Sequence, residues 1–163
     1  MSSLTIRNKS LLLSFVIIAG FLFAVTLVST DTDAQEVYPE GDFTYLIDTS
    51  GTTAGVYAYN GTDETVTVPG TIYYEEKDYN IVRICDAAFA NKNVTSVTLP
   101  ISLKTIGEHA FEGCDNLTSI TIPSAVTGLE WRCFASCDNL VTVTFGQDSQ
   151  LTTLGGSAFV SCH

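Results

Sequence analysis

The chain contains few basic residues and almost no histidine. Seven Lys and Arg residues are set against 18 Asp and Glu residues, so the formal net charge at pH 7 is −11. A nucleic-acid-binding protein needs a basic face to neutralise phosphate groups, so this balance argues against nucleic acid as a partner. The acidity is typical of a soluble, solvated surface.

Residues suited to metal binding and catalysis are also scarce. Cys133 and Cys137 have the spacing of a metal-ligand pair, but neither a second pair nor a ligand histidine follows, so we expect no metal and no cofactor. His109 and Cys114 lie close enough in sequence to suggest a nucleophilic Cys–His pair. No third residue that would orient the histidine is evident, and no pair of acids stands out as a glycan-hydrolysing site. We therefore expect no enzymatic activity.

One long apolar run lies near the N-terminus. Leu11–Val28 is apolar over 18 residues, follows Arg7 and Lys9, and precedes small residues that offer a cleavage site. Its length lies between that of the apolar region of a secretory signal, about 7–15 residues, and that of a membrane-spanning helix, roughly 20 residues. Residues 1–34 are therefore predicted to be a cleaved signal peptide or an uncleaved N-terminal transmembrane anchor. Both alternatives place the rest of the chain outside the cytoplasm, in the extracellular space or at the cell surface.

The rest of the chain is organised around a repeat with a period of 23 residues. Three copies, residues 94–116, 117–139 and 140–163, follow a degenerate first copy with an insertion, residues 65–93. The recurring positions are Val97, Ile120 and Val143; Leu99, Ile122 and Phe145; Ile106, Leu129 and Leu154; Phe111, Phe134 and Phe159; and Cys114, Cys137 and Cys162. Self-similarity at this period predicts a repeat solenoid.

Each copy combines an alternating segment with a second apolar arm. In Ser119–Ile122, hydroxyl and apolar side chains alternate, which is typical of a half-buried strand. Pro123 then ends the strand because proline cannot donate to a ladder. The second arm carries Leu129 and Phe134, which we expect to point inward. One copy cannot bury its apolar face alone, so stacked copies should share a continuous core.

This pattern resembles the BspA-type, or Treponema pallidum-type, leucine-rich repeat over roughly residues 43–163. The matching residues are Leu117, Ile120, Ile122, Pro123, Val126, Leu129, Phe134 and Cys137, and in the preceding copy Gly107, Ala110, Phe111 and Cys114. Glu130 and Cys133 depart from the pattern. The resemblance implies a leucine-rich-repeat solenoid with short parallel β-strands, irregular or short helical second arms, and an N-terminal β-cap.

The cap is expected within residues 35–64, after a short polar linker at Gln35–Gly41. Its strands should lie near the segments FTYLID and VYAYN. Residues 72–81 are expected to form a loop or hairpin inserted in the first copy. The array reaches His163 within a repeat and without a polar capping unit, so we expect a truncated chain or an open end that a partner covers.

The five cysteines have two interpretations. An exported chain permits disulfides, and an odd count leaves one thiol unpaired. Three of the cysteines share one repeat position, however, and this favours small, buried, stacked thiols.

The predicted ligand-binding residues are Thr98, Thr121, Thr144 and Trp131. The threonines share one outward strand position, so we expect them about 4.8 Å apart across a parallel sheet. Trp131 aligns with Asp86, Glu108 and Gly156 in a column expected to be exposed, which makes it a candidate flanking anchor.

Solenoids present extended surfaces that suit macromolecular partners. The family resemblance implies cell-surface adhesion or host and cell interaction, with proteins or surface glycans as partners and membrane contact only through the N-terminal segment. The alternative is a structural surface spacer without a specific ligand.

Overall fold

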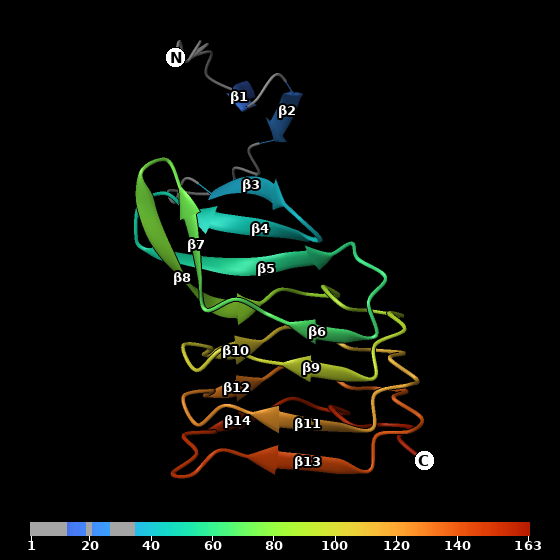
Figure 1. Cartoon of the computed structure of the whole chain (residues 1–163). Coiled ribbons are helices and arrows are strands. Elements are labelled where there is room, and N and C mark those ends of the chain that lie inside the picture. Colours follow the sequence, from blue (N-terminus) through green and yellow to red (C-terminus); the bar gives the residue numbers. More distant parts are fainter. Residues whose placement is uncertain (1–12, 19–20, 27–34) are drawn as a thin grey trace.

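The computed structural model describes residues 13–18, 21–26 and 35–163 (Figure 1). The predicted targeting segment, residues 1–34, therefore lies largely outside the described residues. Within it, β1 (Leu13–Ile18) and β2 (Phe21–Thr26) pair antiparallel. No helix in the described part of the chain is long and apolar enough to span a membrane. The signal peptide or anchor remains a prediction.

An antiparallel cap precedes the repeats. It consists of β3 (Gln35–Glu40), β4 (Phe43–Asp48) and β5 (Thr53–Tyr59). The prediction of a polar linker at Gln35–Gly41 was wrong, because Gln35–Glu40 form β3 and pair with β4 over the whole strand. β5 then pairs in parallel with the first strand of a repeat ladder, so the cap sheet continues directly into the solenoid. The predicted N-terminal β-cap is thus confirmed.

The insertion in the first copy is a hairpin. β7 (Thr71–Tyr74) and β8 (Lys77–Ile84) pair antiparallel around a turn at Glu75 and Glu76, whose φ angles are 45° and 63°. Two of its tyrosines, Tyr74 and Tyr79, are buried, whereas Tyr73 is 63% exposed. Tyr74 contacts Tyr38 of β3, and β8 pairs with β5, so the hairpin packs against the cap and leaves the side chain of Tyr73 in solvent.

Two parallel ladders run along the repeats (Figure 1). The first ladder, in front in the figure, consists of two hydrogen-bonded strand pairs that follow one another along the array. These are β6 (Thr65–Thr67) with β9 (Ser96–Thr98), and β11 (Ser119–Ile122) with β13 (Thr142–Phe145). The second ladder, behind it, consists of β8, β10 (Thr105–Ile106), β12 (Gly128–Leu129) and β14 (Thr153–Leu154). The predicted solenoid of short parallel strands is confirmed.

A third side of each coil is a ladder of turns. In this ladder, backbone N–H groups donate hydrogen bonds to carbonyl oxygens of the next coil. The N–H of Phe89 donates to Ala110 O, that of Phe111 to Cys133 O and that of Phe134 to Ala158 O, each at 2.8 Å. Each turn holds two residues with positive φ, at Ala87, His109, Arg132 and Ser157 and again at Asn91, Gly113, Ser136 and Ser161. Left-handed residues cannot continue a right-handed helix. The second arms are accordingly irregular, and the described residues contain no helix.

The core is a continuous stack that the repeat columns build. Phe89, Phe111 and Phe134 are fully buried, and neighbouring rings stack with centroids 4.9 Å and 5.1 Å apart. The stack reaches Tyr59 of the cap at one end and Phe159 at the other, with centroid distances of 5.2 Å and 5.4 Å. Burying each ring contributes about 1.5–3 kcal/mol, so this column is a main source of stability.

Apolar columns become exposed in the last coil. Leu129 is fully buried, whereas Leu154, which occupies the same position one coil later, is 60% exposed. Phe145 is 42% exposed, although its counterpart Ile122 is buried. This contrast shows that each coil is covered by its neighbour, as expected for a stack in which no unit buries its own apolar face.

Candidate functional site

The first ladder presents a regular row of hydroxyl groups to solvent. We call this surface the hydroxyl face; its members are Thr65, Thr67, Ser96, Thr98, Ser119, Thr121, Thr142 and Thr144, all of them exposed. The residues between them, Val66, Val97 and Ile120, are buried. This alternation follows from the two-residue period of a strand. The predicted outward position of Thr98, Thr121 and Thr144 is therefore what the structure shows.

The hydroxyl groups are aligned between strands. Thr67 pairs with Thr98 and Thr121 pairs with Thr144, each in a parallel register. Paired residues on adjacent strands lie about 4.8 Å apart. Among the described residues, no hydrogen bond is formed by the side-chain hydroxyls of Thr98, Thr121 or Thr144. These hydroxyls remain free to bond an external group.

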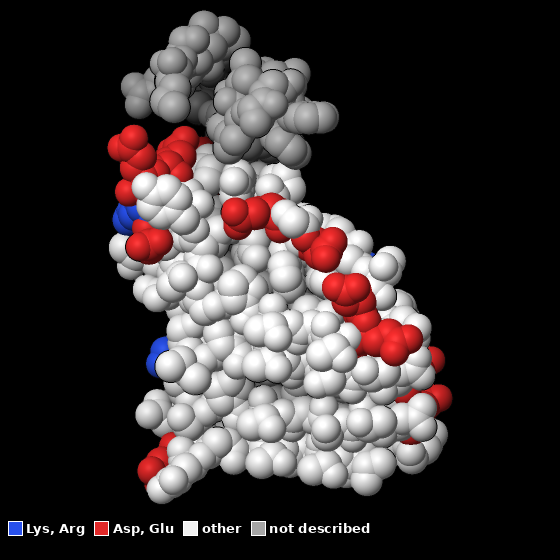
Figure 2. All heavy atoms as spheres, viewed as in Figure 1, with Lys and Arg blue, Asp and Glu red and all other residues white. Residues whose placement is uncertain are grey.

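The hydroxyl face is uncharged and has an acidic border. Figure 2 shows the surface over β6, β9, β11 and β13 without basic or acidic side chains, whereas acidic side chains gather along its right-hand margin. Exposed acids occur just before the strands, at Asp63, Glu64, Asp115 and Asp138. The face therefore suits a polar, uncharged ligand surface, and the border discourages anionic partners.

Trp131 lies on a different side of the coil. It follows β12 on the turn ladder and is 45% exposed. Its ring meets that of His109 edge-on, with centroids 4.8 Å apart, and the guanidinium carbon of Arg132 lies 5.5 Å from the indole centroid. Its described contacts include none of the three threonines. The structure thus brings the threonines together and groups Trp131 with two other side chains.

Glu112 holds this aromatic group in place. Arg132 Nη2 donates to Glu112 Oε1 at 2.7 Å, and His109 Nδ1 bonds Glu112 Oε2. Burial raises the pKa of Glu112, but the hydrogen bond from His109 and the charge of Arg132 together outweigh it and hold this pKa below its usual value. The sequence carried one signal for this cluster, because His109 and Arg132 share a repeat position and Glu112 follows His109 by three residues.

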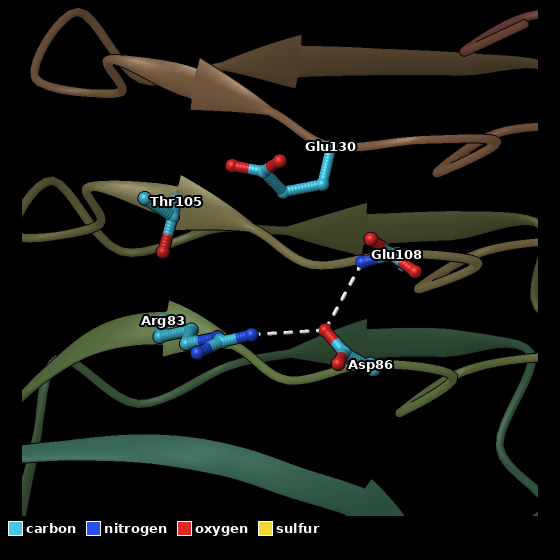
Figure 3. A pocket seen from close by; sticks show the side chains of 5 residues that line it. All are labelled: Arg83, Asp86, Thr105, Glu108 and Glu130. Atoms are coloured by element: carbon cyan, nitrogen blue, oxygen red, sulfur yellow. Dashed lines mark hydrogen bonds and ion pairs between the residues drawn. The ribbon is translucent and has the colours of Figure 1, made fainter. Parts of the chain in front are cut away.

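A small polar hollow of about 180 Å³ opens on the second ladder (Figure 3). It is lined by Arg83, Asp86, Thr105, Glu108 and Glu130. Asp86 Oδ1 accepts from Arg83 Nη2 at 2.9 Å and from the backbone N–H of Glu108 at 3.1 Å, so it ties two coils together. The described residues include no group of three or more potential metal ligands. Sequence reasoning did not find this hollow.

The cysteines are free thiols, and four of the five are buried. Cys114 Sγ donates to Phe89 O at 3.0 Å, Cys137 Sγ to Phe111 O at 3.1 Å, and Cys162 Sγ to Phe134 O at 3.2 Å. Burial raises the pKa of Cys114 to about 11 and that of Cys137 to about 12. The prediction of stacked, buried thiols is confirmed for Cys114 and Cys137, whereas Cys162 in the last coil is only partly buried.

The conceivable Cys–His pair is not assembled. The Cys114 thiol points to the carbonyl oxygen of Phe89, whereas the His109 ring contacts Glu112 and Trp131. A nucleophilic cysteine must be a thiolate near neutral pH, and a raised pKa opposes this. The geometry therefore gives no support to a thiol-based active site.

A comparison with protein families matches residues 79–163, more than half of the chain, to the family described as BspA type leucine rich repeat region. A comparison with curated proteins finds no significant match.

Solved structures share the fold. A leucine-rich repeat protein from Bacteroides capillosus has a TM-score of 0.66 and 24% identity, over 74% of this chain and 93% of that chain. The T. pallidum leucine rich repeat protein has a TM-score of 0.58 and 21% identity, over 77% and 67% of the two chains. A leucine rich cell surface protein from Faecalibacterium prausnitzii has a TM-score of 0.55 and 19% identity, over 77% of this chain and 52%, about half, of that protein.

Proposed function

This chain belongs to the BspA-type leucine-rich-repeat family, and from that premise we propose that it is an exported binding protein of the cell surface. Its partners are proteins or glycans on other cells or in the surrounding matrix. A similar solved structure is described as a cell surface protein, which supports the location. The apolar run Leu11–Val28 after Arg7 and Lys9 supports export.

The observation that carries the proposal is the hydroxyl face. Its eight members are exposed on four strands, in parallel register within the pairs β6–β9 and β11–β13. Each hydroxyl can donate one hydrogen bond and accept others, which matches the mixed donors and acceptors of glycans and of polar protein surfaces. Strands hold the hydroxyls in fixed positions, so binding costs little side-chain ordering. We assign Thr98, Thr121 and Thr144 as the central contacts.

Trp131 is the fourth proposed binding residue. An exposed tryptophan contributes a large, rigid contact area, and such residues often dominate interfaces. Its place on the turn ladder separates it from the threonines. We therefore propose that Trp131 makes a separate contact with a ligand and does not form the edge of the hydroxyl face.

The alternative function is a structural spacer without a specific ligand. Threonine also suits exposed strand positions for purely conformational reasons, and a spacer would show the same sequence pattern. A spacer has no saturable partner, whereas a binding protein has one.

An adhesion assay separates the two functions. Beads coated with the full chain are incubated with immobilised matrix proteins and with intact epithelial cells, and bound beads are counted as the coating density rises. Saturable retention above that of beads carrying the heat-unfolded chain supports the binding protein. Retention equal to the unfolded control at every coating density supports the spacer and overturns the proposal.

A further inference from the structure

We propose that the surface around Trp131 is a second binding site, distinct from the hydroxyl face, and that it takes a neutral pyranose ring of a glycan. We call this surface the Trp131 corner; it consists of Glu108, Trp131, Arg132, Gly156 and Ser157. The ring of Trp131 is 45% exposed, and it is the sole tryptophan of the chain. The inference rests on the proposed function, which gives Trp131 its own contact, and deepens it by naming the ligand class of that contact.

Gly156 leaves the indole uncovered on the side of the next coil. Glu108, Trp131 and Gly156 occupy the same repeat position on successive coils. A Cβ added at Gly156 would lie 3.4 Å from Trp131 Cδ1 and 3.8 Å from Nε1. Any larger side chain at this position would therefore lie against the indole. With glycine here, a flat ligand ring gains access to that part of the aromatic surface.

The indole is held in one orientation before any ligand arrives. His109 meets it edge-on from the preceding coil, with centroids 4.8 Å apart, and the Arg132 guanidinium lies 5.5 Å from its centroid. Glu112 fixes both neighbours through its two carboxylate oxygens. A preorganised side chain loses little conformational entropy on binding, so the contact area of Trp131 converts efficiently into affinity.

Residues that can bond sugar hydroxyls occupy the coils on either side of Trp131. The Glu108 carboxylate lies on the preceding coil and the Ser157 hydroxyl on the following one, and both side chains are exposed. Glu130, which precedes Trp131, lines the polar hollow together with Glu108 (Figure 3). In the described part of the chain neither Glu108 nor Glu130 forms an ion pair, so both carboxylates remain available as acceptors. The apolar face of a pyranose presents C–H groups, which the negative face of an aromatic ring attracts.

The local charges select an uncharged ligand. Arg132 already lies over the indole, so a cationic ligand at the ring would face repulsion from its guanidinium. Glu108 and Glu130 in turn repel carboxylate-bearing sugars. A neutral hexose ring meets neither penalty, and its hydroxyls match the flanking acceptors.

The sole tryptophan makes this proposal directly measurable. Intrinsic tryptophan fluorescence of the full chain reports on the Trp131 corner while cellohexaose, laminarihexaose or mannohexaose is titrated in. Oligogalacturonate and a glucosamine hexamer serve as anionic and cationic comparators. We expect a saturable change with at least one neutral hexasaccharide and a weaker response to both charged ones. No change with any of the three neutral sugars, or an equal response to a charged one, overturns the proposal.

Variants locate the site. Gly156→Leu places a side chain against the indole and should weaken the neutral sugar by about tenfold or more. Trp131→Ala, followed by calorimetry because it lacks the fluorophore, should abolish binding. Tyr57→Ala removes another exposed aromatic residue, on the cap, and should leave binding unchanged. Sugar binding that survives Trp131→Ala contradicts the proposal.

One further variant separates this proposal from the function proposed above. Thr121→Lys disrupts the hydroxyl face and should leave the fluorescence response to sugar intact. If Thr121→Lys abolishes sugar binding while Gly156→Leu preserves it, the sugar binds at the hydroxyl face. That result overturns the Trp131 corner and leaves the proposed function standing.

Discussion

Phe111 and Phe134 stack face to face on successive coils, with ring centroids 5.1 Å apart and ring planes 4° apart. The two residues occupy the same position in copies that begin 23 residues apart. Their contact follows from the repeat period, because each period of sequence forms one coil of the solenoid. Both rings are fully buried.

This stack predicts a large loss of stability when one ring is removed. Phe134→Ala leaves a cavity between Phe111 and Phe159 and should lower the free energy of unfolding by about 3–5 kcal/mol. Thr121→Ala, on the exposed hydroxyl face, should lower it by about 0.5 kcal/mol or less. Denaturant unfolding of both variants measures the difference. Equal destabilisation by the two substitutions would contradict the assignment of inward and outward columns.

The buried thiols predict that stability falls at alkaline pH. Burial raises the pKa of Cys114 from 9.0 to about 11 in the folded chain. Between these values the unfolded chain loses the thiol proton while the folded chain retains it, so the unfolded state is favoured as pH rises. The contribution is fully present below pH 9.0 and lost toward pH 11.

The measurement is the free energy of unfolding as a function of pH, for the wild-type chain and for Cys114→Ala. The variant is less stable throughout because of its cavity, but its stability should fall less steeply over this range. Buried tyrosines such as Tyr45, whose pKa burial raises to about 12, add a slope that both chains share. Identical slopes in the two chains would refute the role of Cys114.

Export predicts that the repeats are accessible from outside the cell. Protease added to intact cells that produce the full chain should digest the region from Phe43 onward, because the positive residues Arg7 and Lys9 keep the N-terminal end inside. A cytosolic marker protein serves as the control for cell integrity. Complete protection, together with recovery of the protein in the cytosolic fraction, would contradict export.

The repeat pattern was sufficient to predict the solenoid, its parallel strands and its aromatic column. Periodicity identifies which residues share a column, and the apolar columns are expected to be buried because one copy cannot cover its own apolar face. The stacked thiols were found by the same reasoning. β3 was missed because a polar segment such as Gln35–Glu40 forms a strand only through its partner β4, and a tertiary contact of this kind leaves no local signal.

The position of Trp131 was harder to predict. A shared repeat position indicates that residues lie above one another on successive coils, but it does not indicate on which side of the coil they lie. That depends on the bends between the arms, which here use non-glycine residues at positive φ such as His109 and Arg132. Non-glycine residues are uncommon in this conformation, so the sequence does not indicate where these bends occur. The Glu112 cluster and the polar hollow depend on the same bends and were missed for the same reason.

The most direct test of the central claim compares two charge substitutions in the adhesion assay. Thr121→Lys places a charge in the middle of the hydroxyl face, where a bound ligand would desolvate it without a partner. Lys104→Glu also alters charge, at an exposed position that precedes β10 on the second ladder. We predict that Thr121→Lys reduces bead retention to the level of the unfolded control and that Lys104→Glu retains the wild-type level. Retention of Thr121→Lys beads at the wild-type level would show that the hydroxyl face is not the binding surface.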